Sequence, residues 1–382
     1  MRRDNALLLA TRGLRAFGFG FAAVLVALDL ERAGLSPTLI GLTLGLGLAA
    51  ASLSGLASAW LSGRYGRRAT LAVVGLLMAA TGLDLALAGQ PTLLVLSGVT
   101  GMLGAASVDL GPFASVEQAV LAEAVPPEGR NRAFGRYALA GGLFNAAGGL
   151  SAAVAGNPRY FFLLYAALGL ATGTLALLMS GRVEAGRVPH VFGSIRPLAG
   201  LSALFALDSL GGGFVANAVI AYWLHVRFGT SPALLGPIFA GVAVLQSVSY
   251  EVSGRLGDRI GLINTMVFTH LPSNLLLLLV PLAPSLPWAV GLLFARFALS
   301  QMDVPARQAY VVSIVPPAQR AGAVAVTGAV RGVAQAFGPA LAGVAIGAAA
   351  FGVPFYAGGG LKIVYDLGLF TAFRNRRAEH ET

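Results

Sequence analysis

Residues 254–261 read GRLGDRIG and lie between two long apolar runs. Residues 60–68, WLSGRYGRR, have the same setting in the first part of the chain, with glycines and arginines between two apolar runs. Glycine permits a tight turn, and clustered arginines are typical of one side of a membrane. Each stretch therefore predicts a short connection between two membrane-spanning helices.

The composition also indicates a membrane protein. Of 382 residues, 56% are hydrophobic and 11% are charged, whereas soluble domains carry about 25% charged residues. The mean hydropathy is +0.77. The absence of cysteine excludes disulfides, thiolate metal ligands and cysteine nucleophiles.

Twelve apolar runs are long enough for transmembrane helices, which need about 20 residues each. They cover residues 14–34, 37–62, 69–89, 92–123, 133–155, 158–180, 198–227, 230–253, 262–283, 286–315, 321–345 and 349–372. The first run is long and is followed by polar residues, so it does not fit a cleaved signal peptide. The sequence predicts an all-α membrane protein.

Arginines are distributed unevenly between the two predicted sides of the membrane. Most arginines lie at the chain ends or, like Arg64 and Arg130, in the even-numbered connections. The other side has only Arg32, Arg159 and Arg227. The positive-inside rule then places both termini in the cytoplasm, and we expect the inner membrane of a bacterium. The net charge of +10 is thus explained by topology, and we expect no nucleic-acid partner.

The two halves of the sequence repeat each other. Residues 34–41 (GLSPTLIG) align with residues 229–236 (GTSPALLG), and Glu117-Gln118-Ala119 aligns with Arg307-Gln308-Ala309 in the same order. Repeats in the same orientation predict two pseudo-symmetric six-helix bundles. The predicted units are residues 1–180, a cytoplasmic linker at 181–197, and residues 198–382.

Together with the twelve spans, the two quoted loops resemble the signature loops of the major facilitator superfamily. The residues that carry the resemblance are Gly254, Asp258, Arg259 and Gly261 in the fuller copy and Arg64, Gly66 and Arg67 in the other, where Gly63 stands at the position of the family's aspartate. The resemblance covers essentially the whole chain. It implies a secondary transporter in which two bundles rock about a central cavity lined by the first, fourth, seventh and tenth spans.

The resemblance also implies a role for the loop aspartate. In the family this carboxylate docks at a helix N-terminus of the opposite half and latches the cytoplasmic gate. We expect Asp258 to pair near the start of the fifth span, around Arg132.

Ionisable residues inside spans cost at least about 2.5 kcal/mol each and mark functional sites. The candidates for proton coupling or substrate binding are Asp208, Asp303, Arg296, Arg307, Asp109, Glu117 and Arg331. Arg296, Ser300, Asp303 and Arg307 are spaced by four, three and four residues, which predicts one face of one helix.

Other polar residues in the spans have weaker signals. Asp208 precedes Gly211-Gly212-Gly213, where a helix can bend, and Lys362 and Asp366, four residues apart, are expected to neutralise each other. His270 is more typical of a helix–helix hydrogen bond than of a proton relay. Polar side chains that line the cavity or bridge helices are Asn145, Asn217, Gln246 and Tyr250.

Two chemistries are open to the buried groups. A carboxylate such as Asp208, Asp303 or Asp109 binds and releases a proton, or Arg296, Arg307 and Arg331 receive an anionic substrate. Alternatively, Arg307 and Glu117 are ion-paired struts of the gate that never contact substrate.

The pattern predicts proton-coupled efflux of a small organic solute by a monomer, with no cofactor. An organic-anion transporter is the alternative, and a metal exporter is a weaker one because only carboxylates remain as ligands. Antiport is only loosely indicated, since Gly338-Pro339 occurs in the eleventh span while the fifth span lacks a matching proline. No nucleotide-binding loop or enzyme motif occurs.

Overall fold

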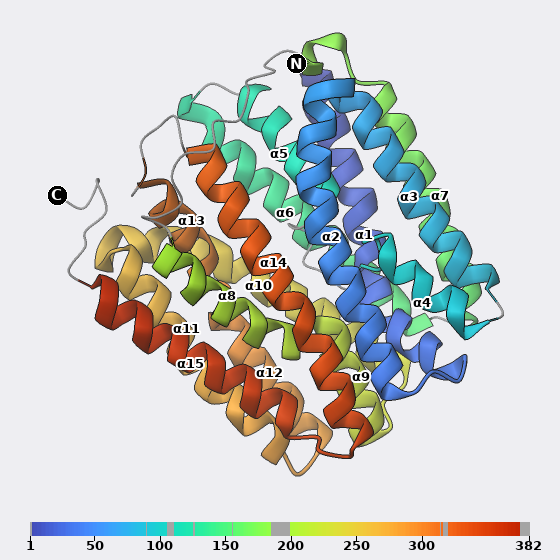
Figure 1. The fold of residues 1–382 in the computed structure, drawn as a ribbon, viewed down its shortest axis with the longest axis vertical. Coiled ribbons are helices and arrows are strands. Elements are labelled where there is room, and N and C mark those ends of the chain that lie inside the picture. The colour runs from blue at the N-terminus through green and yellow to red at the C-terminus, as the bar shows by residue number, and fades with distance from the viewer. Residues whose placement is uncertain are drawn as a thin grey trace.

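The computed structural model describes residues 2–88, 90–104, 111–124, 127–154, 156–184, 199–313, 315 and 320–374. In these ranges the chain is helical and forms no β-strand (Figure 1). The α-helices are α1 (Arg2–Arg32), α2 (Pro37–Tyr65), α3 (Arg67–Leu87), α4 (Pro91–Val99), α5 (Pro112–Ala124), α6 (Pro127–Ser151), α7 (Pro158–Leu177), α8 (Ala199–Phe214), α9 (Asn217–Phe228), α10 (Pro232–Ile260), α11 (Leu262–Leu279), α12 (Leu286–Leu299), α13 (Asp303–Ser313), α14 (Arg320–Gly347) and α15 (Val353–Phe373).

These helices account for all twelve predicted spans. Nine stretches of the described residues are long and apolar enough to cross a membrane. The fourth, seventh and tenth spans are each a pair of shorter helices: α4 with α5, α8 with α9, and α12 with α13. The prediction of one continuous helix for the fourth and tenth spans is therefore wrong.

The two loops quoted from the sequence fold into the same turn. Gly66 (φ 99°, ψ 154°) ends α2 and precedes α3, and Gly261 (φ 86°, ψ 161°) does the same between α10 and α11. A positive φ is strained for any residue with a Cβ, so glycine is needed at both turns. Each of these turns follows a helix of 29 residues, α2 or α10. The two repeated loops therefore have matching surroundings in the structure.

Each half of the molecule is a bundle of its own helices. We call α1–α7 the N-half and α8–α15 the C-half. In the N-half α1 packs on α6 and α7, and α3 packs on α7; in the C-half α8 packs on α14 and α15, and α11 packs on α15. The halves meet where α2 packs on α14, α6 on α10, and α1 on α9 (Figure 1).

The halves converge toward one end of the bundle. We call the end that carries the start of α1 and the end of α15 the terminal face, and the other end the opposite face (Figure 1). Near the opposite face, a Cβ on Gly41 of α2 would lie 2.3 Å from the carbonyl oxygen of Pro339 and 2.8 Å from Cα of Gly343, both on α14. The backbones of α2 and α14 approach this closely because Gly41 and Gly343 have no side chain.

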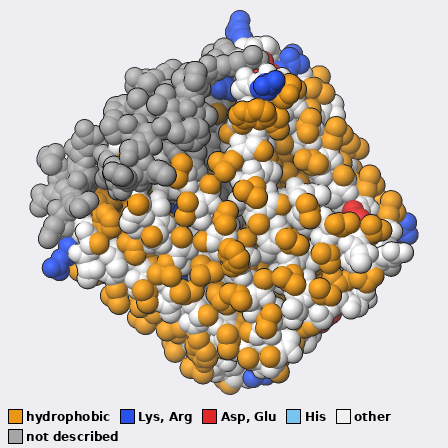
Figure 2. Space-filling view, viewed as in Figure 1, with side chains coloured by type: hydrophobic (Ala, Val, Ile, Leu, Met, Phe, Trp, Pro, Cys, Tyr) orange, Lys and Arg blue, Asp and Glu red, His pale blue; other side chains and the backbone are white. Residues whose placement is uncertain are grey.

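The outer surface of the bundle is apolar. Hydrophobic side chains cover the visible face, and the Lys and Arg side chains drawn on it lie at its periphery (Figure 2). On α14, for example, Phe337 is 62% exposed and Leu341 is 51% exposed. Large apolar side chains in contact with solvent are unfavourable in water but suit a lipid environment. The chain is a multi-pass membrane protein.

Candidate functional site

The breaks in the seventh and tenth spans are local features of the sequence. In the seventh span α8 ends just beyond the three glycines, and Val215 and Ala216 separate it from α9. In the tenth span Pro305 lies in the first turn of α13. Proline has no N–H and its ring clashes with the carbonyl four residues earlier, so Pro305 favours the break between α12 and α13, although Pro272 of α11 and Pro339 of α14 lie inside continuous helices.

This break corrects the predicted stripe of the tenth span. Arg296 belongs to α12, whereas Asp303 is the first residue of α13 and Arg307 lies one turn further on. Arg296 therefore does not share a helix with Asp303. The close contact between Asp303 and Arg307 is retained, with Nη1 of Arg307 2.7 Å from Oδ2 of Asp303.

Four of the buried charges in the C-half form a continuous set of ion pairs. Asp208 of α8 accepts from Nζ of Lys362 at 2.7 Å through Oδ1 and from Nη1 of Arg307 at 3.2 Å through Oδ2. Arg307 also donates to Asp303. The side chains of these residues are at most 8% exposed. We call Asp208, Asp303, Arg307 and Lys362 the C-half charge network; it links α8, α13 and α15.

Lys362 and Asp366 do not neutralise each other as expected. Lys362 bonds to Asp208, and Asp366 instead contacts two side chains of α11. Oδ1 of Asp366 lies 2.8 Å from Nδ1 of His270, and its Oδ2 accepts from Asn274 at 2.9 Å. The physical reason is that α8 and α11 both pack on α15. They bring Asp208 to Lys362 and His270 to Asp366, so that neither residue of the pair depends on the other for a partner.

Two further arginines lie near this network and have no hydrogen bond to a carboxylate among the described residues. Arg331 of α14 donates through Nε to Oγ of Ser209 at 3.1 Å. Arg296 is 5% exposed, and its guanidinium lies 4.6 Å from the ring of Phe297. Its Nε and Nη1 have no hydrogen-bond partner among the described residues. A buried cation with unsatisfied donors is costly unless a ligand completes it.

The N-half has its own buried ion pair. Oε2 of Glu117 on α5 lies 2.7 Å from Nη2 of Arg15 on α1 and accepts from the hydroxyl of Tyr137 on α6 at 2.5 Å. Oε1 accepts from Thr11 at 2.9 Å. Glu117 and Arg307, which align in the repeat, are thus both paired within their own halves. The roles of Arg15 and Tyr137 were not predicted from the sequence. Arg15 stands at the start of the first apolar run, and no motif marks Tyr137.

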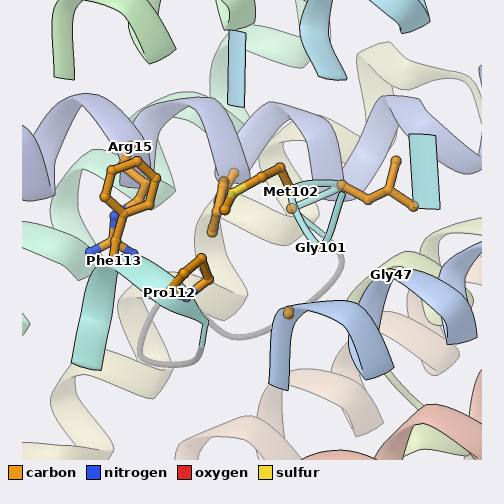
Figure 3. Close-up of a pocket in the computed structure, with 10 residues that line it drawn as sticks. Arg15, Gly47, Gly101, Met102, Pro112 and Phe113 are labelled. Carbon is orange, nitrogen blue, oxygen red and sulfur yellow. The ribbon is translucent and has the colours of Figure 1, made fainter. Parts of the chain in front are cut away.

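Arg15 also lines a small cavity of the N-half (Figure 3). With Phe19 of α1 and with Pro112 and Phe113 at the start of α5, it encloses about 10 Å³, room for about one water molecule. The other lining residues are Gly47, Ala51, Gly101, Met102, Leu103 and Gly104. Asp109, another sequence candidate, lies outside the described residues.

The polar side chains predicted to line the cavity or to bridge helices stand on α6, α9 and α10 where the structure describes them. Asn145 of α6 donates to the carbonyl of Ala16 at 3.4 Å, a bridge between helices. Asn217 begins α9, and Gln246 is half-buried on α10. The side chain of Tyr250 lies outside the described residues.

At the first signature loop, where the family's aspartate is missing, a different carboxylate binds the start of α3 within the same half. Glu184, which follows α7, accepts from the backbone N–H of Arg67 at 2.6 Å and of Arg68 at 3.1 Å, and so caps the start of α3. The Arg67 guanidinium donates to the carbonyl of Val183 at 3.1 Å. Arg64 is exposed and lies over the ring of Trp60.

At the second signature loop, Gly261 forms the turn and Arg259 is exposed. Gly254 lies within α10. The side chains of Asp258 and Arg132 lie outside what the structure describes. The latch between Asp258 and the fifth span stays a prediction.

Among the described residues, a contact between Glu31 and His225 joins the halves near the opposite face. Oε2 of Glu31 at the end of α1 lies 3.1 Å from Nε2 of His225 on α9, and Tyr222 donates to Oε1 at 3.2 Å. The side chains of Glu31 and His225 are about one-third exposed, at 36% and 34%. This contact ties α1 to α9, as the close packing of Gly41 ties α2 to α14.

A membrane bundle of two six-helix halves, with broken spans beside buried ion pairs, has the architecture of a secondary transporter. The sequence profile described as the Major Facilitator Superfamily matches residues 8–208 and 201–382. The chain belongs to this superfamily. It is a transporter of small molecules and not an enzyme.

Similar proteins agree with this assignment. The "Uncharacterized membrane protein YJR124C" of Saccharomyces cerevisiae is 24% identical over 97% of this chain and 94% of its own length. Among solved structures, a D-xylose-proton symporter superposes with a TM-score of 0.74 at 19% identity over 96% of this chain and 97% of the other.

Two more solved structures share the fold. The nucleoside transporter NupG has a TM-score of 0.75 at 14% identity over 98% of this chain and 100% of its own. The human organic anion transporter MFSD10 has a TM-score of 0.68 at 17% identity over 96% of this chain and 97% of its own. At these identities the likeness concerns the fold alone.

Proposed function

We propose that this transporter exports a small organic solute in exchange for protons, and that the C-half charge network couples the two movements. The observation that carries the proposal is Asp208, whose two carboxylate oxygens hold two cations from two other helices. A carboxylate at such depth is expensive and is retained where it serves transport.

The arrangement gives a protonation event a mechanical consequence. While Asp208 is ionised, it holds Lys362 of α15 and Arg307 of α13 against α8. A proton taken up beside Asp208 changes the charge that these two cations face and weakens their hold on α8. The helices of the C-half then favour a different packing, which is the kind of two-state element that alternating access needs.

The orientation in the membrane is part of the proposal. The bias of arginines places the terminal face in the cytoplasm, in the inner membrane of a bacterium. Residues 1–180 and 198–382 then form the two moving units, joined by the linker at 181–197, and one chain is sufficient for transport.

The test is flux into and out of proteoliposomes under an imposed pH gradient. D-xylose, uridine and benzoate serve as probes, because the solved structures of the same fold include a xylose symporter, a nucleoside transporter and an organic anion transporter. We expect one probe class to move against its gradient when a pH gradient is present, and Asp208→Asn or Asp303→Asn to abolish this accumulation. Full accumulation in both variants, or solute movement that ignores the pH gradient, contradicts the proposal.

A second candidate, transport of an organic anion, is favoured by Arg296. Its Nε and Nη1 are buried donors without a hydrogen-bond partner among the described residues, and an anionic ligand that accepts from either of them lowers the cost of burying the cation. We expect benzoate to raise the apparent Tm of the purified protein and Arg296→Gln to remove this shift, while D-xylose and uridine have no such dependence. A metal exporter is less favoured, since no group of three or more His, Asp or Glu in the described ranges is arranged to hold a metal ion.

A further inference from the structure

His270 lies between two carboxylates that belong to two different helices. Its Nδ1 is 2.8 Å from Oδ1 of Asp366 on α15, and its Nε2 is 3.7 Å from Oδ1 of Asp208 on α8. The side chains of all three residues are at most 5% exposed. Each ring nitrogen therefore faces a carboxylate oxygen.

The orientation of the ring is fixed by a second layer of contacts. Asn274, one turn along α11, donates to Oδ2 of Asp366 at 2.9 Å and leaves Oδ1 for the imidazole. Tyr365 packs edge-on against the ring, with centroids 5.9 Å apart. The amide nitrogen of Asn274 also lies 3.2 Å from Nδ1. With Oδ1 of Asp366 as the acceptor for a proton on Nδ1, Nε2 is the atom whose proton comes and goes.

The oxygen that faces Nε2 already has another partner. Oδ1 of Asp208 bonds to Nζ of Lys362 at 2.7 Å, and the same oxygen is the one 3.7 Å from Nε2. A proton on Nε2 creates a second cation that competes with Lys362 for one oxygen. Protonation of His270 therefore weakens the contact between α8 and α15.

Charged groups from several helices surround His270. They are Asp208 from α8, Lys362 and Asp366 from α15, and Asp303 and Arg307 from α13, and Arg331 of α14 bonds to Ser209, the residue after Asp208. The two carboxylates that face the ring directly are Asp366 and Asp208. Tyr365 of α15 also touches the ring, and Arg296 of α12 reaches α11 through its carbonyl, which accepts from Ser273.

We infer that His270 is the proton-binding residue of this transporter, that Asp366 and Asn274 position it, and that its proton competes with Lys362 for Asp208. The proton from water adds to the lone pair on Nε2 of the neutral ring, and the same N–H bond breaks on release, so no other reactant is needed. The inference rests on the proposed proton coupling and names the residue that performs it.

The first experiment observes the proton directly by solid-state NMR of protein labelled with [15N]histidine in lipid bilayers. The chain has four histidines, and the difference spectrum with His270→Gln assigns the signals of His270 against His190, His225 and His380. We expect two protonated ring nitrogens at acidic pH, and loss of the Nε2 proton alone at alkaline pH. A ring that keeps one protonation state from pH 5 to pH 9, or a neutral ring that carries its proton on Nε2, overturns the inference.

Variants separate positioning from simple packing. Asp366→Asn keeps the shape of the side chain and removes its charge, so we expect the doubly protonated fraction of His270 at a fixed pH to fall about tenfold. Lys362→Gln removes the competitor and should increase that fraction. The matched control is Thr269→Ala, because this neighbouring hydroxyl bonds to the carbonyl of Thr265 in its own helix. A spectrum of Asp366→Asn identical to that of the control contradicts the positioning role.

The second experiment tests the link to transport in proteoliposomes with the probe that the unmodified protein accumulates. We expect His270→Gln to lose accumulation driven by the pH gradient but to retain exchange of labelled for unlabelled probe. If the variant still accumulates the probe, the assignment of His270 fails while proton coupling stands. If the unmodified protein shows no response to the pH gradient, the proposed function fails, and the NMR result still decides whether His270 binds a proton.

Discussion

Lys362 illustrates how a buried charge chooses its partner. Asp366 lies one turn away on the same helix, yet the ammonium of Lys362 bonds to Asp208, 154 positions earlier in the chain. Glu117 and Arg15 likewise meet across 102 positions. A charge in the membrane interior is stabilised by the partner that tertiary packing brings to hydrogen-bonding distance. The spacing of residues along one helix does not determine which partner that is.

At the residue scale, the burial of an ion pair predicts the cost of breaking it. Glu117→Gln leaves Arg15 charged at 0% exposure, and we expect a loss of about 3–5 kcal/mol and a clear fall in apparent Tm. The matched control is Glu31→Gln, whose pair with His225 is about one-third exposed and should cost at most about 1 kcal/mol. Thermal unfolding of both variants in the same detergent measures the difference. Equal effects would show that burial does not set the cost here.

At the element scale, the ends of the helices decide where side chains are presented. The glycines Gly66 and Gly261 turn the chain between α2 and α3 and between α10 and α11, and these turns were foreseeable from the quoted loops. The breaks in the fourth and tenth spans were not foreseen, although Pro305 and the positive-φ glycines Gly101, Gly104 and Gly111 were visible in the sequence. Apolar runs show that a span exists but not whether it is one helix.

The cap of α3 gives a test at this scale. Glu184→Gln removes the charge that accepts from the N–H groups of Arg67 and Arg68 at the positive end of the helix. We expect a loss of about 1 kcal/mol and faster hydrogen exchange of these two amides. Arg182→Gln in the same short segment is the control, because its side chain is exposed. Unchanged exchange in Glu184→Gln would mean that the carboxylate does not hold the start of α3 in solution.

Packing between helices of one half gives a second test. A Cβ on Gly338 of α14 would lie 2.2 Å from the carbonyl carbon of Gly213 on α8. Since both atoms are backbone, neither can move aside alone, and we expect Gly338→Ala to cost about 1–3 kcal/mol. Gly328→Ala on the same helix has no atom within 4 Å and serves as the control. The comparison of apparent Tm values checks the prediction, and a neutral Gly338→Ala would contradict the close crossing of α8 and α14.

At the scale of the whole molecule, the contacts between the halves define which end is closed. Gly41 and Gly343 bring α2 and α14 together near the opposite face, where Glu31 also meets His225 (Figure 1). In a transporter that alternates between two packings, contacts of this kind must form and break in each cycle. Small residues lower the cost of closing, because the backbones meet without side-chain rearrangement.

A wedge in this contact should shift the balance between the two packings. A Cβ at position 343 would lie 2.4 Å from the carbonyl oxygen of Pro37, so we expect Gly343→Leu to open the opposite face. Because the chain has no cysteine, spin labels at Ala33→Cys and Ser231→Cys report the distance between the halves without background labelling. A longer-distance population should appear in Gly343→Leu and be absent in Gly328→Leu. Identical distance distributions in the two variants would refute the closed contact.

The sequence by itself determined the class of the molecule. Its apolar runs, the repeated loops at 60–68 and 254–261, and the aligned segments at 34–41 and 229–236 are local patterns, and hydrophobic length and turn chemistry act over a few residues to a few tens of residues. The tertiary structure decided which charges meet. Asp208 with Lys362, Glu117 with Arg15 and His270 with Asp366 are contacts between helices, and their geometry depends on how whole helices cross.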